Sequence, residues 1–413
     1  MKTKTIISSL LVLSLCTTLY AAPRQDNSFQ ELKAEVTGVI LEQFSKPTLD
    51  DLIKAIKQND LKAVRTLINK GVNINAQLAD GSTPLIEAVK TKDIDIEIVK
   101  LLIRKKNINT YDKKGMDALM WAVKKHADIE IIKLLVAKGA DLTAEDGEYC
   151  SALGMAFKEK EEDVALFLIE KGAPVEMSYE ISWAAERNWM EVLKALVERG
   201  ANVNPRRGID VHPPLDYAIM NENIEMVEYL LEHGADVNYT KSKNSPLSYA
   251  VFKNRADIAR LLLERGAKLR WIYRHYYDYL MPSNLDNTPM VLFAAWKGNK
   301  EMVELLIEYG ADVNEKSEEG LYTALGRAAE IGNIDVAELL IKKGADIEAL
   351  DNGNTPLLNA VFYNKIKMVE FLIAKGADVN AKNRNGNTAL RYARKNKNKE
   401  MIKLLKQHGA RRW

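Results

Sequence analysis

Residues 287–311 read NTPMVLFAAWKGNKEMVELLIEYGA, and this stretch predicts a complete pair of helices. Thr288 followed by Pro289 is typical of a helix start, because threonine caps free amides and proline has no amide to leave unpaired. Gly298 permits a turn after the first helix. Gly310 ends the second helix, because glycine adopts a left-handed backbone at little steric cost. Neither helix can bury its apolar stripe alone, so we expect the pair to pack against others of its kind.

The ending of this unit recurs along the chain, and most intervals between successive glycines are 32 to 34 residues. The interval from Gly71 to Gly139 covers two periods, with Lys106 near the place expected for a middle glycine. A fixed period of this length is typical of a solenoid, in which each unit contacts its neighbours. The repeat-ending glycines are Gly71, Gly139, Gly172, Gly200, Gly234, Gly266, Gly310, Gly344, Gly376 and Gly409.

The repeat resembles the ankyrin repeat. T-P-L occurs at 83–85 and 355–357 and S-P-L at 245–247, while G-A-D-V-N occurs at 234–238 and 376–380. Together with a period near 33 residues, these motifs extend the resemblance over about ten to eleven units. The resemblance implies an all-α solenoid of helix-turn-helix units, with short β-turn or hairpin fingers along one edge.

The chain also departs from the family pattern. Ankyrin repeats usually carry a histidine after T-P-L, bonded back to the threonine, and no copy here has one, so we expect packing between neighbouring units to carry more of the stability. The interval from Gly172 to Gly200 is short, at 28 residues, and that from Gly266 to Gly310 is long, at 44. The long interval predicts an insertion over residues 270–286. The histidine position is occupied by Ile86, Met120, Gly154, Asp216, Ser248, Leu358 and Arg391.

Residues 1–22 have the features of a secretory signal. Lys2 and Lys4 precede a mostly apolar run over 6–19, and the small residues at 21–22 offer a cleavage site. The run is too short to span a bilayer comfortably, so we expect Sec-type export to the periplasm or out of the cell. The signal and the many Lys, Asn and Ile residues favour a bacterial source. A helix buried in a cytoplasmic protein is the alternative.

The rest of the chain divides into residues 23–48, a linker and capping helix, and residues 49–413, the repeat domain. Apolar residues at helical spacing within 32–44 predict the cap, because the ends of a solenoid need cover. The first repeat lacks T-P-L and is degenerate. Removal of the signal leaves Cys150 as the single cysteine, so no intramolecular disulfide is expected.

The insertion is the most informative departure. Residues 270–282 contain five aromatic side chains and two arginines, a composition typical of interface hot spots. In the ankyrin family this segment forms a finger beside the concave face. The alternative is that the aromatic side chains fill a gap between repeats, and we favour binding. The candidate residues are Trp271, Tyr273, Tyr276, Tyr277 and Tyr279.

A second candidate surface comes from the ends of the first helices, which face the concave groove in this family. These positions are charged in the first half of the chain and aromatic or apolar in the second half. Exposed apolar patches usually mark a contact surface, so we place partner binding on repeats six to ten. Any one of these side chains could instead pack against the next repeat. The candidate residues are Phe252, Trp296, Ile331, Phe362 and Tyr363.

The charge of the chain argues against general nucleic-acid binding. The net charge is +2, and loss of Lys2 and Lys4 would leave 57 basic and 57 acidic residues. Residues 381–413 are an exception, with eleven lysines and arginines and one acidic residue, Glu400. We interpret this segment as a polar capping repeat, with weak docking to an anionic surface as the alternative.

The sequence predicts no enzyme, no metal site and no cofactor. The five histidines are scattered, and no nucleophile motif, metal-ligand spacing or phosphate-binding glycine loop is present. We therefore predict a monomeric, non-enzymatic module that binds a protein partner. The alternatives are a periplasmic inhibitor or immunity protein that blocks a toxin or hydrolase, and an exported effector that binds host proteins. A catalytic domain with a repeat arm is disfavoured, because no non-repeat segment is long enough.

Overall fold

The computed structural model describes residues 46–148, 150–175, 180–205, 212–239, 245–269, 289–317 and 322–411. In this part of the chain there are twenty-two helices in eleven consecutive pairs, and the remaining ordered contacts include two isolated antiparallel bridges. The predicted all-α solenoid of paired helices is therefore confirmed. The signal segment, most of the predicted cap and the aromatic insertion lie outside the described residues.

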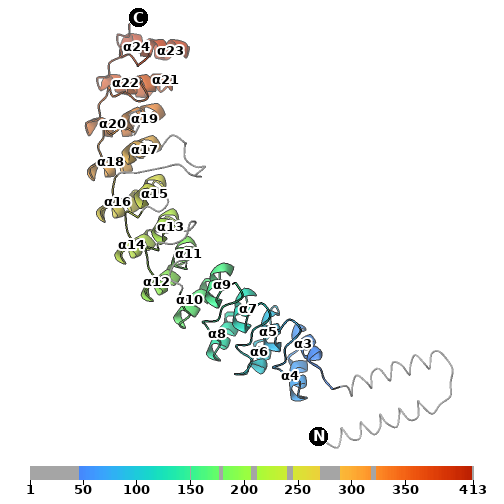
Figure 1. The fold of residues 1–413 in the computed structure, drawn as a ribbon. Coiled ribbons are helices and arrows are strands. Elements are labelled where there is room, and N and C mark those ends of the chain that lie inside the picture. The colour runs from blue at the N-terminus through green and yellow to red at the C-terminus, as the bar shows by residue number, and fades with distance from the viewer. Residues whose placement is uncertain are drawn as a thin grey trace, which may run out of the picture. The chain divides into compact units, whose positions relative to one another are not determined.

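The chain divides into two compact units, Met1–Val164 and Ala165–Trp413, which we call the N-terminal and C-terminal units. In the N-terminal unit the first helices of successive pairs pack on one another, α3 on α5, α5 on α7 and α7 on α9, and the second helices form a parallel row (Figure 1). Its helices are α3 (Leu49–Lys57), α4 (Leu61–Asn69), α5 (Pro84–Lys90), α6 (Ile96–Leu102), α7 (Ala118–Lys124), α8 (Ile129–Ala137) and α9 (Ala152–Glu159). The boundary falls within α10 (Glu162–Glu170).

The C-terminal unit repeats the same arrangement, with α11, α13, α15, α17, α19, α21 and α23 packed in that order. The earlier pairs are α11 (Glu180–Glu186), α12 (Met190–Glu198), α13 (Pro214–Met220), α14 (Ile224–Glu232), α15 (Pro246–Phe252) and α16 (Ala256–Glu264). The later ones are α17 (Met290–Lys297), α18 (Lys300–Glu308), α19 (Ala324–Ile331), α20 (Ile334–Lys342), α21 (Pro356–Phe362), α22 (Ile366–Ala374), α23 (Ala389–Lys395) and α24 (Lys399–Gln407).

The helices begin and end largely where the motifs predict. The Thr83 side chain caps α5 by accepting from the amide of Ile86, with Pro84 at the first helical position. In α17 the cap position is taken by Pro289 itself, without a side-chain cap, and Thr288 lies outside the described residues. All ten repeat-ending glycines have φ between 84° and 96°, so their left-handed conformation is confirmed.

The repeat without a middle glycine closes differently. Helix α6 ends early, at Leu102, and Lys106 does not take a left-handed conformation. The Asn107 side chain takes over instead: its Nδ2 donates to the carbonyl of Leu102 at 2.9 Å, and its Oδ1 accepts from the amide of Arg104 at 2.9 Å. A buried side chain thus satisfies the helix end where no glycine is available.

Successive pairs are also joined by asparagines, a role that the sequence analysis did not predict. In each case the Nδ2 donates to the carbonyl of the next repeat-ending glycine at 2.8–3.2 Å. The Oδ1 accepts from a backbone amide two residues beyond that glycine at 2.8–3.0 Å. We call these residues the asparagine ladder: Asn109, Asn204, Asn238, Asn314 and Asn380.

Candidate functional site

A row of apolar side chains follows the C-terminal ends of the first helices in the C-terminal unit. Because α13, α15, α17, α19 and α21 pack in succession, residues at matching positions lie along one edge of this unit. Of these, Phe362 and Tyr363 are 45% and 46% exposed and Met220 is 36% exposed, while the others are half-buried. We call this set the aromatic row: Met220, Phe252, Trp296, Ile331, Phe362 and Tyr363.

The middle of the aromatic row is a cluster around a buried phenylalanine. The ring of Phe293 is fully buried and stacks on Phe252, with centroids 6.4 Å apart, and lies 5.8 Å from Trp296. The ammonium group of Lys297 lies 5.0 Å from the Phe252 centroid and 5.8 Å from that of Trp296. A lysine over several ring faces is held by cation–π attraction, which fixes its position among the aromatic side chains.

The far end of the row is more exposed. Phe362 meets Tyr363 edge to face, with centroids 5.1 Å apart at 81°, and meets Tyr392 in the same way at 5.4 Å and 79°. Burial raises the pKa of the Tyr363 phenol, and a hydrogen bond to Glu330 raises it further. Tyr363 is therefore a neutral phenol at physiological pH, with a polar group beside an apolar face.

Polar groups beside this end are held rigidly. The Arg327 guanidinium lies 3.7 Å from the centroid of Tyr322 and forms an ion pair with Glu330. Next to them, the buried carboxyl group of Asp351 accepts from the amide of Thr323 at 2.9 Å and from Nδ2 of Asn359 at 3.2 Å. Burial raises the pKa of the Asp351 carboxyl. This network supports the helices that carry the exposed aromatic pair.

The structure places the predicted site residues unequally. Phe252, Trp296, Ile331, Phe362 and Tyr363 come together in the aromatic row, on four packed helices or directly after one of them. The residues of the insertion lie outside the described residues, so their part in binding stays a prediction. They are Trp271, Tyr273, Tyr276, Tyr277 and Tyr279.

The matching positions of the N-terminal unit are charged, as expected, but Lys90 is bonded to neighbouring side chains and partly buried. Lys90 donates to Oγ of Ser82 at 2.7 Å and to Glu87 at 3.0 Å, and its ammonium lies 4.5 Å from the Trp121 ring centroid. The indole N–H of Trp121 donates to the buried carboxylate of Asp112 at 2.8 Å. The sequence analysis missed this network, which joins residues from two successive repeats.

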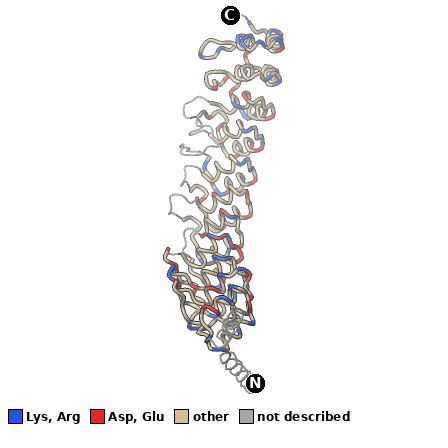
Figure 2. The backbone as a smooth tube through the Cα atoms, turned by 90° about the vertical axis from the view of Figure 1, so that its right-hand side faces the viewer, with Lys and Arg blue, Asp and Glu red and all other residues tan. Residues whose placement is uncertain are grey.

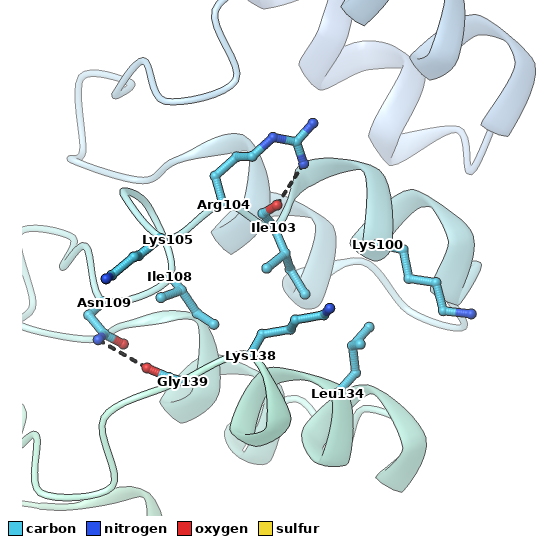
Figure 3. A pocket seen from close by; sticks show the side chains of 9 residues that line it. All are labelled: Lys100, Ile103, Arg104, Lys105, Ile108, Asn109, Leu134, Lys138 and Gly139. Carbon is cyan, nitrogen blue, oxygen red and sulfur yellow. Dashed lines mark hydrogen bonds between the residues drawn. The ribbon is translucent and has the colours of Figure 1, made fainter.

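A pocket of about 790 Å³ opens in the N-terminal unit beside the irregular end of α6 (Figure 3). Ile103, Ile108 and Leu134 provide its apolar surface. Four cationic side chains also line it, but Lys100 and Lys105 point away from each other in Figure 3, and Arg104 donates to the carbonyl of Ile103 at 2.6 Å. These cations do not converge on one point. The lining residues are Lys100, Ile103, Arg104, Lys105, Ile108, Asn109, Leu134, Lys138 and Gly139.

Among the described residues, no group of three His, Cys, Asp or Glu residues could hold a metal ion. Burial raises the pKa of the half-buried Cys150 thiol, which disfavours the reactive thiolate. Burial also raises the pKa of Asp117 to about 6, but its Oδ1 caps α7 by accepting from the amide of Met120 at 2.8 Å.

None of the helices in the described part of the chain is both long and apolar enough to cross a membrane.

The family comparison agrees with this architecture. A family model described as ankyrin repeats in three copies matches residues 52–146, 97–179, 181–270, 275–351 and 348–412. Among solved structures, the ankyrin repeat domain of human ASB11 is 24% identical, with a TM-score of 0.46, and the match covers 56% of this chain and 99% of that domain.

Three curated proteins share part of the chain. An ankyrin repeat and KH domain-containing protein of Caenorhabditis briggsae is 26% identical over 185 residues, 44% of this chain and 7% of that protein. A putative palmitoyltransferase of Danio rerio is 33% identical over 198 residues, 46% of this chain and 30% of that protein. An E3 ubiquitin-protein ligase of Arabidopsis thaliana is 25% identical over 287 residues, 65% of this chain and 15% of that protein. The match thus spans less than a third of each relative.

Proposed function

Because the chain belongs to the ankyrin repeat family, whose repeats are generally protein-interaction modules, we propose that it binds a protein partner through the aromatic row of its C-terminal unit. Repeat proteins present extended surfaces on which matching positions of successive units act together. The residues proposed to contact the partner are Phe252, Trp296, Ile331, Phe362 and Tyr363, with Met220 at one end. The insertion residues 270–286 are proposed to extend the same surface.

The observation that carries this proposal is the exposed pair of Phe362 and Tyr363. Both side chains are nearly half exposed, although exposure of such large apolar groups to water is unfavourable for the folded state. Aromatic residues that pack on each other while leaving a face open are typical of binding hot spots. The half-buried Trp296 and Phe252 continue the apolar surface along the same edge.

Rigid support strengthens the proposal. Lys297 is held over three rings, and the Arg327–Glu330 ion pair fixes the neighbourhood of Tyr363. Side chains that are already ordered lose less conformational entropy when a partner binds. The aromatic row therefore suits tight binding with little rearrangement.

The finer role and the cellular location form part of the proposal. The charged start, apolar run and small residues of 1–22 support export, to the periplasm or the medium of a bacterial cell. Expression of the full chain with a C-terminal tag, fractionation and N-terminal sequencing test this. A mature chain that begins near residue 22 or 23 outside the cytoplasm is expected, and an intact Met1 in the cytoplasm would contradict export.

Co-purification from native cells, followed by binding measurements with the purified partner, tests the interaction. Trp296→Ala and Phe362→Ala should each weaken binding by roughly tenfold or more, as expected for truncation of a hot-spot aromatic. Tyr309→Ala is the matched control, because Tyr309 is also an exposed aromatic, at 38%, but caps α18 away from the row. Equal affinity of all three variants would contradict the proposed surface. Loss of a partner enzyme's activity on binding would identify an inhibitor.

A further inference from the structure

Nearly all charged residues of the last helix pair, α23 and α24, are positive. Residues 381–411 contain ten lysines and arginines and a single acidic residue, Glu400 (Figure 2). Arg391, Arg394 and Lys395 on α23 are exposed. Among the described residues 384–411, no lysine or arginine forms an ion pair with a carboxylate. The described residues therefore provide no ion pair that neutralises Arg391, Arg394 or Lys395.

Three helices elsewhere in the chain balance such charges locally. Lysines pair with glutamates one turn earlier on three helices, with N–O distances of 2.7 to 3.0 Å for Glu97–Lys100, Glu130–Lys133 and Glu191–Lys194. In contrast, α23 places Arg391 four residues before Lys395, and such like-charged neighbours destabilise a helix. The end of a solenoid must be polar, but a mixture of signs would meet that need without repulsion. Capping alone does not explain a surface of one sign.

The basic surface adjoins the exposed end of the aromatic row. Nδ2 of Asn396 donates to the carbonyl of Phe362 at 3.2 Å, and the ring of Tyr392 meets that of Phe362. Lys395 occupies on α23 the position that Phe362 occupies on α21, one packed helix away. Axes of packed helices are about 8–10 Å apart, which corresponds to about three residues of extended chain at roughly 3.3 Å each.

Two arginines extend this surface across the end of the unit. Arg391 and Arg394 stand on α23 where α21 carries Leu358 and Val361. Those two residues are almost completely buried, whereas the arginines are exposed, because no further described helix covers that side of α23. The exposed Phe362 and the three exposed cations thus lie on two helices that pack on each other, α21 and α23.

We infer that this surface takes an acidic protein segment, with an apolar side chain against Phe362 and Tyr363 and carboxylates about three residues further on against Lys395, Arg394 and Arg391. The inference rests on the proposed function, because it uses one end of the aromatic row and adds the chemistry of the partner. Complementary charge speeds association and selects the partner, while the aromatic contact provides the anchor.

The aromatic geometry favours a protein segment over single-stranded nucleic acid. Bases stack on open ring faces, but the rings of Phe362, Tyr363 and Tyr392 meet edge to face at angles near 80°. Glu330 also lies beside Tyr363, where its negative charge would oppose a phosphate backbone. An apolar side chain fits this corner, and the carboxylates of the same segment lie beyond it, away from Glu330.

Fluorescence anisotropy with defined probes tests the inference on the full chain. The main probe is a twelve-residue peptide with one tryptophan followed by glutamate at every third position. A second peptide replaces the tryptophan by serine, a third replaces every glutamate by glutamine, and the last probe is a fifteen-nucleotide oligothymidylate. The variant is the triple substitution Arg391→Gln, Arg394→Gln and Lys395→Gln.

The matched control is the triple substitution Lys300→Gln, Lys342→Gln and Lys343→Gln, which removes the same charge from exposed lysines away from α23. The main peptide should bind the wild type, bind the α23 variant about tenfold more weakly, as expected for a few exposed ion pairs, and bind the control within twofold. Phe362→Ala should weaken binding of the tryptophan peptide and leave the affinity for the serine peptide unchanged. High salt should shrink the loss caused by the α23 variant and leave the loss caused by Phe362→Ala unchanged.

Several outcomes would overturn the inference. They are no binding of the main peptide by the wild type, equal binding by the α23 variant and the control, and tighter binding of oligothymidylate than of the peptide. The proposed function has its own readout in the affinity of the native partner for the Trp296→Ala chain. Suppose that the native partner no longer binds the Trp296→Ala chain but still binds the α23 variant. The proposed function would then stand, and the inference of an acidic segment would be wrong.

Discussion

A Cβ atom on Gly326 would lie 2.2 Å from Oδ2 of Asp351, so the absent side chain of one residue makes room for the carboxyl group of the other. Gly326 sits inside α19, and Asp351 belongs to the segment before α21. The same oxygen accepts from the amide of Thr323, just before α19. This close approach joins two consecutive repeats near Tyr363.

Substitution of Gly326 should therefore destabilise the protein. Alanine normally stabilises a helix interior relative to glycine by up to about 1 kcal/mol, but here it must displace the Asp351 side chain. We expect Gly326→Ala to lower the free energy of unfolding by about 1–3 kcal/mol, measured by urea denaturation. Gly154→Ala in α9 is the control, because its Cβ would lie 3.2 Å from Sγ of Cys150 and needs only a small shift. Equal stability of the two variants would contradict the close contact.

Stability should depend on pH through Asp117. Burial raises its pKa to about 6, whereas an unfolded aspartate titrates near 3.9, so the folded chain binds the proton more tightly. This contribution to stability is complete below about pH 4 and is lost as the pH rises through 6. Asp117→Asn keeps the cap oxygen and cannot ionise, so relative to the wild type it should gain up to about 3 kcal/mol between pH 4 and 7.

Urea midpoints of both chains at several pH values between 4 and 7 measure this difference. Asp128→Asn is the matched control, because it makes the same change at the exposed cap of α8. A constant difference between wild type and Asp117→Asn across this range would contradict the assignment.

The Trp121–Asp112 hydrogen bond should contribute to the stability of the N-terminal unit. Trp121→Phe keeps an aromatic ring but leaves the buried Oδ2 of Asp112 without its indole donor. We expect a loss of about 1–3 kcal/mol in the free energy of unfolding, followed by circular dichroism. A double-mutant cycle with Asp112→Asn isolates the pair, since the two losses should then be less than additive. Additive losses would show that the bond contributes little.

The asparagine ladder should stabilise the junctions between repeats. Asn314 donates to the carbonyl of Gly344 at 3.0 Å and accepts from the amide of Asp346 at 2.8 Å. Asn314→Ala should cost about 1–2 kcal/mol and speed hydrogen exchange at the Asp346 amide. Asn385→Ala is the control, because Asn385 lies in an exposed turn outside the ladder. Unchanged exchange at Asp346 would contradict the role of the ladder.

Much of the fold could be predicted from local pattern. Glycines such as Gly310 and caps such as Thr83 act within a few residues of themselves, so their spacing alone predicts where helices begin and end. The contacts that were missed join residues far apart in the sequence. Asn314 and Gly344 are 30 residues apart, and Thr323 and Asp351 are 28 apart. Such contacts depend on how two repeats are stacked, which no local motif specifies.

The candidate site shows the same division. The sequence placed aromatic residues at matching positions of successive repeats, which was enough to predict a row on one edge of the stack. It could not predict that Phe362 and Tyr363 stay exposed while Trp296 and Phe252 are half-buried over Phe293. Exposure depends on which neighbouring side chains cover a residue, and those neighbours come from other repeats.

By itself, the amino-acid sequence determined the period, the paired helices, their caps and the positive end of the chain, because each follows from residue type and short-range spacing. The tertiary structure decided which of these residues meet: Asp351 with Gly326, Trp121 with Asp112, and Phe362 with the basic helix α23. Burial, and with it the raised pKa of Asp117, arises only when neighbouring repeats exclude water from a side chain.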